Sequence, residues 1–177
     1  MLIRAEHPAE HERVELIHAT AFGGHQEADV VRALRQSATY RPDWSLVADE
    51  SGTILAHVML SHVGLQDSAG TVRRIAALAP LAVLPPHQCK GIGSALVRRG
   101  LELLDSQHEP LVIVRGELGY YGRFGFRPSI IVGVRAPFPV DADHYLALAL
   151  SAYQADFRGI VRYPQAFCAV GYEAQWP

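Results

Sequence analysis

The sequence predicts an α/β (α+β) fold in which helices and strands share a single domain spanning residues 1–177. Segments whose apolar residues recur every three or four positions, typical of amphipathic helices, alternate with segments of two-residue alternation or continuous apolar residues, typical of strands. The length of 177 residues and the hydrophobic content of 49% suit one ordinary globular core. We therefore expect helices packed on a central sheet.

The N-terminal quarter of the chain is expected to hold one strand and two helices. Residues 2–5 alternate and predict a short strand. Residues 8–22 predict a helix, with a proline in a first-turn position. A glycine pair at 23–24 ends this helix, and the spacing of apolar residues predicts a second amphipathic helix over 26–37.

A hairpin and a third strand are predicted next. The hairpin strands cover residues 45–48 and 53–65, joined by a polar turn at 49–52. Alternation places four apolar side chains on one face of the second strand: Ile54, Ala56, Val58 and Leu60. The returning strand covers 71–84, and we expect it to bend near Pro80, because proline has no N–H for the strand ladder.

Residues 79–106 hold the pattern around which the rest of the chain is organised. A strand ends at the proline pair 85–86, a glycine-bearing turn follows at 88–93, and a helix begins near Gly91 and runs to Ser106. One half of its helical wheel is apolar: Ile92, Leu96, Val97, Gly100, Leu101, Leu103 and Leu104. Beyond this helix we expect a buried strand at 110–114 and later strands at 130–135, 145–150 and 161–170.

Composition excludes several classes of protein. The net charge of −2 provides no basic field for nucleic acid, and no apolar run is long enough to cross a bilayer. The N-terminal residues lack the features of a signal peptide, so we expect a cytoplasmic protein. Cys89 and Cys168 form neither a disulfide framework nor a metal cluster. His7 and His11 lie four positions apart but have no further ligands beside them, so we interpret them as exposed residues at a helix entry, and no metal is expected.

The turn at 88–93 is suited to bind an anion. The first N–H groups of a helix have no partner inside it, and the helix dipole places about half a positive charge there. Gly91 and Gly93 have no Cβ, so the backbone can approach a pyrophosphate closely. Lys90 is the only lysine in the chain and adds an ammonium beside them. Cys89 is a conceivable nucleophile at this helix start, but we interpret it as the occupant of a variable loop position.

The known phosphate loops differ in how well they match this turn. A Walker loop needs Gly-Lys followed by Ser or Thr, and a dinucleotide fingerprint needs a third glycine where Leu96 stands. The acetyl-CoA loop Q/R-x-x-G-x-G/A is matched by Gln88, Gly91 and Gly93, after a V-x-P element at 83–85. On these residues the chain resembles the GCN5-related N-acetyltransferase (GNAT) superfamily.

A second motif, Y-G-R-F-G-F at 121–126, resembles the Y-x-x-x-G-F element of the same superfamily. Together with A-P-L-A-V at 79–83 and Y-P-Q-A-F at 163–167, it resembles the YhbS-like N-acetyltransferase branch over almost the whole chain. The resemblance implies a mixed, mostly antiparallel sheet of six to seven strands, splayed between strands 4 and 5 and flanked by about four helices. It also implies acetyl-CoA (coenzyme A) as co-substrate, bound by Leu81, Ala82, Val83, Gln88, Cys89, Lys90, Gly91, Ile92, Gly93 and Ser94.

Acetyl transfer to an amine needs a base, oxyanion stabilisation and a proton for the leaving thiolate. By resemblance Tyr121 supplies that proton, and backbone N–H groups at 81–83 stabilise the oxyanion. Deprotonating an alkylamine of pKa near 10.4 at neutral pH costs about 4.6 kcal/mol, so a base is required. Relatives often carry an asparagine where this chain has Val114, and a glutamate in the strand over 73–83, where this chain has no acid. The base therefore stays unassigned, with four candidates by chemistry: Glu27, Asp29, His62 and Glu117.

The leading function is an acetyl-CoA-dependent N-acetyltransferase that acts on a primary amine of a small molecule or a protein. The alternative from another class is a module that binds an acyl-CoA or a partner protein without turnover. The motifs do not name the acceptor, and they leave monomer and homodimer equally open. A nucleotide hydrolase is disfavoured, because no carboxylate-bearing magnesium motif accompanies the loop.

Overall fold

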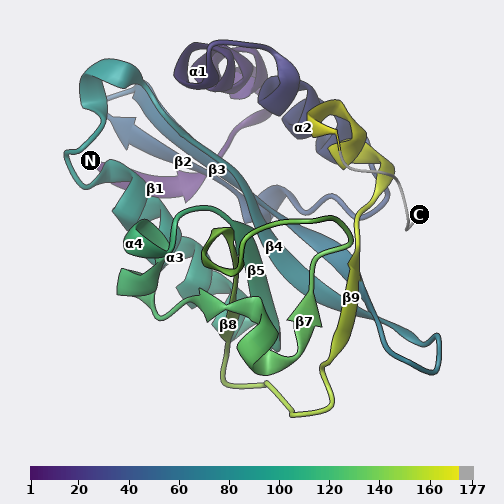
Figure 1. Ribbon diagram of the computed structural model, residues 1–177. Helices are drawn as coiled ribbons and strands as arrows, with labels where there is room; N and C mark the ends of the chain where they lie inside the picture. Colours follow the sequence, from purple (N-terminus) through teal and green to yellow (C-terminus); the bar gives the residue numbers. More distant parts are fainter. Residues whose placement is uncertain (172–177) are drawn as a thin grey trace.

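A computed structural model gives the structure of the chain and describes residues 1–171 (Figure 1). The helices and strands, in chain order, are β1 (Leu2–Ala5), α1 (His11–Phe22), α2 (Gln26–Arg35), β2 (Ser45–Glu50), β3 (Thr53–Gln66), β4 (Val72–Val83), α3 (Ile92–Ser106), β5 (Leu111–Arg115), α4 (Leu118–Tyr121), β6 (Arg127–Pro128), β7 (Val134–Arg135), β8 (Tyr145–Ala149) and β9 (Gly159–Arg162). Short 3-10 helices cover Pro8–Glu10, Pro42–Trp44, Pro85–His87, Gly122–Phe124, Ser129–Val132, Ala142–His144 and Gln165–Val170.

The strands form one mixed sheet in the order β1-β2-β3-β4-β5-β8-β6, and β9 pairs with both β3 and β7. All neighbours are antiparallel except β4 with β5 and β7 with β9. Seven of these strands have four residues or more, and β6 and β7 have two each. The predicted fold class, a mostly antiparallel mixed sheet flanked by helices, is confirmed.

Helices cover both faces of the sheet (Figure 1). On one face α1, α2 and the 3-10 helix Gln165–Val170 bury apolar side chains against β3, β4, β5 and β9. On the other face α3 buries the stripe that its periodicity predicts, with Leu96, Val97 and Leu104 fully enclosed. Because both faces are covered, every residue of β3 except those at its two ends is buried.

The sheet opens between β4 and β5. These two parallel strands pair only at Ala76 with Val112 and at Ala77 with Ile113. From Leu78 to Val83, β4 continues against β3 but has no strand on its other side within the described part of the chain. The expected splay between the fourth and fifth strands is therefore present, and it exposes a strand edge directly before the turn that leads into α3.

The predicted facing of Ile54 is wrong. Ile54 packs in the core under α1 and α2, whereas Ala56, Val58 and Leu60 pack in the core under α3. The cause is a bulge: Ala48 pairs with Ala56 but Asp49 pairs with Ile54, so one extra residue of β3 is accommodated. An extra residue inverts the facing of every side chain before it.

Two predicted strands are largely replaced by 3-10 helix. Of residues 130–135, only Val134–Arg135 forms a strand, after the 3-10 helix Ser129–Val132. Of residues 161–170, the strand ends at Arg162, and Gln165–Val170 is a 3-10 helix that packs on α2. In both cases apolar residues are buried without pairing as strands, which composition alone does not distinguish.

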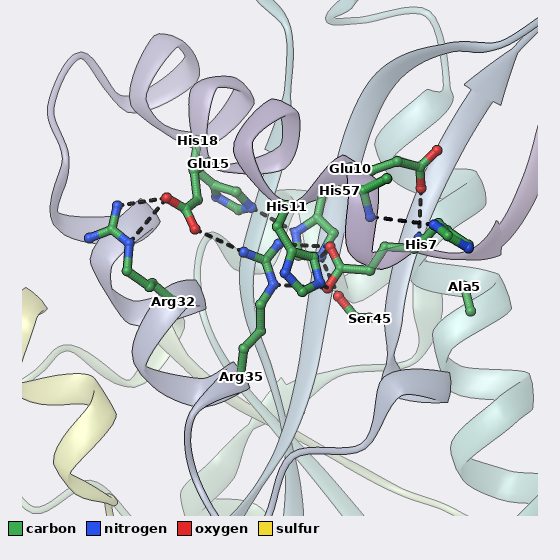
Figure 2. A network of polar contacts seen from close by, with 12 residues as sticks. Ala5, His7, Glu10, His11, Glu15, His18, Arg32, Arg35, Ser45 and His57 are labelled. Atoms are coloured by element: carbon green, nitrogen blue, oxygen red, sulfur yellow. Dashed lines mark hydrogen bonds and ion pairs between the residues drawn. The ribbon is translucent and has the colours of Figure 1, made fainter.

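A buried polar network lies where α1 and α2 cross the sheet (Figure 2). His57 lies on β3, and its Nε2 is hydrogen-bonded to Ser45 Oγ at 2.7 Å. The other ring nitrogen of His57, Nδ1, is hydrogen-bonded at 2.8 Å to Nε2 of His18 on α1. Arg35 on α2 pairs with the buried Glu6 carboxylate through two hydrogen bonds of 3.0 and 2.7 Å. The network ties both N-terminal helices to the sheet.

Candidate active site

The turn before α3 presents a row of unbonded N–H groups. The Gln88 N–H donates to the Pro85 carbonyl at 3.3 Å, and the next bonded N–H is that of Ala95, which donates to the Gly91 carbonyl at 3.0 Å. Within residues 1–171 the backbone N–H groups from Cys89 to Ser94 have no hydrogen-bond partner. Gly91 has a φ of +84° and Cys89 a φ of +58°, which curls the backbone into the helix start. Successive unbonded N–H groups at a helix N-terminus form a site for an anion such as phosphate.

A cavity of about 500 Å³, which we call the loop cavity, lies against this turn. Eight of the ten residues predicted for the co-substrate line it: Leu81, Val83, Gln88, Cys89, Gly91, Ile92, Gly93 and Ser94. Ala82 and Lys90 do not line it, since Ala82 is buried in the sheet and Lys90 is exposed. Gln88 ties the turn to the strand, because its Nε2 donates to the Val83 carbonyl at 3.0 Å.

Three further residues line the loop cavity that sequence reasoning did not assign to it: His87, Tyr120 and Arg123. The Arg123 guanidinium carbon lies 4.7 Å from the centre of the Tyr120 ring, a cation–π arrangement that orients the charge. Gly93 faces the same ring closely, since a Cβ on Gly93 would lie 3.0 Å from the Tyr120 hydroxyl. Arg123 lies within the Y-G-R-F-G-F motif, and Tyr120 directly precedes it. The basic residue in this motif was therefore the sequence feature that could have indicated a further ligand-binding residue.

A second cavity of about 830 Å³, the splay cavity, opens where β4 and β5 separate. Its lining comes from the β4 edge, the β5–α4 junction, α1, α2 and the C-terminal loops: Phe22, Gln26, Glu27, Val30, Leu78, Ala79, Pro80, Leu81, Arg115, Gly116, Glu117, Tyr120, Tyr121, Pro139, Val140, Asp141, His144, Phe167 and Val170. Leu81 and Tyr120 line both cavities. The two cavities therefore adjoin at the unpaired edge of β4.

Tyr121 lies in the wall of the splay cavity. Its ring packs edge-on against Tyr120 and Phe126 and lies directly on Gly116, where any Cβ would overlap the ring. The residue is 9% exposed, and this burial raises the pKa of its phenol, with Tyr120 a smaller cause. No hydrogen bond holds the Tyr121 hydroxyl in the described chain. The phenol therefore keeps its proton at neutral pH and is available as a donor.

The structure separates the four candidate bases. Glu27 and Glu117 line the splay cavity, and Asp29 and His62 line neither cavity. Asp29 pairs with Arg32 on the surface of α2 at 2.6 Å. His62 bonds Glu109 at 2.8 Å and packs against Trp44 on the α3 side of the sheet.

The sequence reasoning also missed a polar cluster of the splay cavity that contains His144 and Asp141. His144 Nε2 lies 3.0 Å from Glu117 Oε1, and His144 Nδ1 lies 4.0 Å from Asp141 Oδ2. These groups come from loops 27 positions apart, with no motif joining them, so the sequence offers no signal that they meet. The cavity wall thus carries a histidine flanked by two carboxylates.

Residues 3–129 match the family model described as an acetyltransferase (GNAT) domain. The chain belongs to the GNAT acetyltransferase family. It is 32% identical over 150 residues to the uncharacterized N-acetyltransferase YjhQ of Escherichia coli K12, covering 82% of each chain. It is 30% identical over 140 residues to the uncharacterized N-acetyltransferase YhbS of the same strain, covering 78% of this chain and 81% of that one.

Solved structures of GNAT proteins agree with this fold. YhbS from Escherichia coli, in complex with CoA, superposes with a TM-score of 0.84 at 27% identity, covering 94% of this chain and 91% of that one. A GNAT acetyltransferase from Brucella melitensis, in complex with acetyl-CoA, gives a TM-score of 0.76 at 30% identity, covering 94% and 97%. The predicted YhbS-like GNAT branch and the prediction of an N-acetyltransferase are both confirmed.

Three structural findings bear on the other expectations for this GNAT protein. None of the helices in residues 1–171 is long and apolar enough to cross a membrane. Over the same residues, no three His, Cys, Asp or Glu side chains are grouped so that they could hold a metal ion. Both cysteines of the chain are free and exposed.

Proposed function

We propose that this GNAT protein transfers an acetyl group from acetyl-CoA to a primary amine of a small molecule or protein, by direct attack of the amine on the thioester. The observation that carries the proposal is the run of unbonded N–H groups from Cys89 to Ser94, placed beside an unpaired strand edge that leads into a second cavity. The complexes of YhbS with CoA and of the Brucella melitensis protein with acetyl-CoA support it.

The loop cavity would hold the diphosphate of the donor. N–H groups at the start of α3 would donate to its oxygens, and the Arg123 guanidinium would add a positive charge from the lining of the same cavity. The pantetheine arm would extend along the edge of β4 over 81–83, which pairs with β3 on one side and with no strand of residues 1–171 on the other. Its thioester then lies at the junction of the two cavities, which Leu81 and Tyr120 share.

Tyr121 would assist the departure of the thiolate. A thiolate, whose thiol has a pKa near 8.5, is a weaker base than a tyrosinate, whose phenol has a pKa near 10. Full proton transfer from an ordinary tyrosine to the thiolate is therefore uphill by about 2 kcal/mol. Burial raises the pKa of Tyr121 and increases that difference. Tyr121 therefore acts mainly by hydrogen bonding to the developing thiolate, and its proton is replaced at once by one from the attacking nitrogen.

A thiol-release assay with acetyl-CoA and a panel of primary amines tests the proposal. We expect turnover with at least one amine and a kcat about tenfold or more lower in Tyr121→Phe. Tyr153→Phe is the matched control, because Tyr153 packs on Phe157 and lines neither cavity. An unchanged kcat in Tyr121→Phe would refute the role of the phenol. Binding of acetyl-CoA without turnover of any amine would instead support the non-catalytic acyl-CoA module.

A further inference from the structure

The proposed reaction needs a group that removes a proton from the acceptor amine. Removing that proton from an alkylammonium at neutral pH costs about 4.6 kcal/mol. The β4 segment over 73–83, beside the thioester position, carries no acid. The proton acceptor must therefore come from the other walls of the splay cavity, whose titratable or charged side chains are Glu27, Arg115, Glu117, Tyr120, Tyr121, Asp141 and His144.

Glu117 fixes the tautomer of His144. A carboxylate only accepts hydrogen bonds, so the 3.0 Å contact with Glu117 Oε1 requires the proton of a neutral imidazole to be on Nε2. The lone pair is then on Nδ1, which is the basic nitrogen. Asp141 Oδ2 lies 4.0 Å from Nδ1, too far for a hydrogen bond, so Nδ1 keeps its lone pair open to an acceptor amine.

Gly116 contacts both the His144 backbone and the Tyr121 ring. The N–H of Gly116 donates to the His144 carbonyl at 3.0 Å, and the Tyr121 ring lies directly on Gly116. Only a residue without a Cβ allows this stacking, so Gly116 joins the phenol to the histidine loop. Tyr121 and His144 therefore have a common anchor at Gly116, directly after β5, and all three residues line the splay cavity.

We infer that His144, oriented by Glu117, is the base that deprotonates the acceptor amine of this enzyme. The inference rests on the proposed function and names its proton acceptor. The His144 side chain is 42% exposed, so the proton it takes can pass to water after each turnover. Imidazole is the side chain that exchanges a proton most readily near neutral pH. Glu117 acts as a positioning residue in the sense that it acts through the histidine.

Each proton released in the proposed reaction has an acceptor. His144 Nδ1 takes one proton from the ammonium, and the freed lone pair forms the bond to the thioester carbon. As the carbon–sulfur bond breaks, the Tyr121 hydroxyl donates a hydrogen bond to the developing thiolate. The sulfur takes the phenol proton only as the new amide nitrogen passes its extra proton to the Tyr121 oxygen, so no tyrosinate accumulates. His144 releases its proton to water, so the net products are the amide, the free thiol of CoA and one proton.

Glu27 is the competing candidate in the lining of the cavity. It comes from the first turn of α2 and faces the same space as His144, with Arg115 also in the lining. A carboxylate there would hold the ammonium by charge, but it would be a weaker base than imidazole toward an alkylammonium. Glu27→Gln is therefore included in the test.

Two acceptors that differ in protonation separate a base from a structural role. Benzylamine is a cation at neutral pH and needs deprotonation, whereas 4-methylaniline is already neutral. We expect His144→Gln to lower kcat/KM about 100-fold for benzylamine at pH 7 and less than about threefold for 4-methylaniline. We expect Glu117→Gln to lower it about tenfold for benzylamine only. Raising the pH should restore the benzylamine rate of His144→Gln.

The controls decide each outcome. His108→Asn removes an exposed histidine that lines neither cavity, and asparagine tolerates its φ of +59°. Equal losses for both amines in His144→Gln, or no loss, would overturn the inference, and a benzylamine-specific loss in Glu27→Gln alone would transfer the role to Glu27. No thiol release from the unmodified enzyme with these two amines or with any other amine of the panel would overturn the proposed function, whereas turnover of the panel with equal losses in His144→Gln would overturn the inference alone.

Discussion

The buried histidines of Figure 2 should make the protein less stable in mild acid. His18 and His57 are fully buried and bonded to each other at 2.8 Å. Burial lowers the pKa of both well below the ordinary value of 6.5, and the charges of the neighbouring histidine and of Arg35 lower it further for His18. The Glu6 carboxylate beside them is already paired with Arg35. Both imidazoles are therefore neutral in the folded protein.

The size of this loss in the free energy of unfolding follows from proton linkage. Between pH 7.5 and 5.5 each of these histidines takes up a proton in the unfolded chain, near its ordinary pKa, but not in the folded one. A folded-state pKa below the unfolded one means that stability is lost as the pH falls through the unfolded pKa. Each histidine removes about 1.4 kcal/mol from the free energy of unfolding over this interval, so the pair removes about 2.7 kcal/mol.

Urea unfolding at pH 7.5 and 5.5 measures this loss. His18→Gln keeps a side chain that can bond His57 but removes one titrating group, so its loss should be smaller by about 1.4 kcal/mol. The carboxyl of Glu10, whose pKa its hydrogen bonds with Arg4 lower to about 2, titrates outside this interval. Equal pH-dependent losses in the two proteins would refute the reasoning, because the same groups would then be titrating in both.

Three substitutions test other parts of the account. Gly93→Val places a branched side chain within 3.0 Å of the Tyr120 hydroxyl, and we expect acetyl-CoA to bind at least about tenfold more weakly by calorimetry, with an unchanged far-UV spectrum. Arg123→Gln should raise the KM for acetyl-CoA about tenfold with little change in kcat, because it removes a charge facing the turn. Gly159→Ala should lower the free energy of unfolding by about 2 kcal/mol or more in urea titrations, because its Cβ would overlap the backbone carbonyl of Gln66.

The predictable parts of the fold are those set by local sequence. The α3 stripe, the turn glycines and the hairpin around 49–52 depend on neighbours within a few positions, and the structure reproduces each of them. Residues 165–170 were predicted to continue a strand but form a 3-10 helix on α2. Ala166 and Phe167 are buried there, so the apolar pattern was informative about burial but not about backbone conformation.

The two cavities of the site also differ in how far the sequence predicts them. The loop cavity comes mostly from one contiguous segment, so a motif was enough to find eight of its residues. The splay cavity is assembled from the two N-terminal helices, the β4 edge and loops near the C-terminus. Contacts such as that of Glu117 with His144 depend on the pairing of β5 with β8, where Arg115 lies opposite Tyr145. Such register is a tertiary property that a single sequence does not reveal.

The central claim is that N–H groups from Cys89 to Ser94 bind the diphosphate of acetyl-CoA. Calorimetric titration with acetyl-CoA and with acetylpantetheine, which has the same thioester arm but no diphosphate, tests it most directly. Two charge-assisted hydrogen bonds of about 1.5 kcal/mol each correspond to about 100-fold in affinity, so we predict that acetylpantetheine binds at least that much more weakly. Equal affinities for the two compounds, or no heat with acetyl-CoA, would contradict the account.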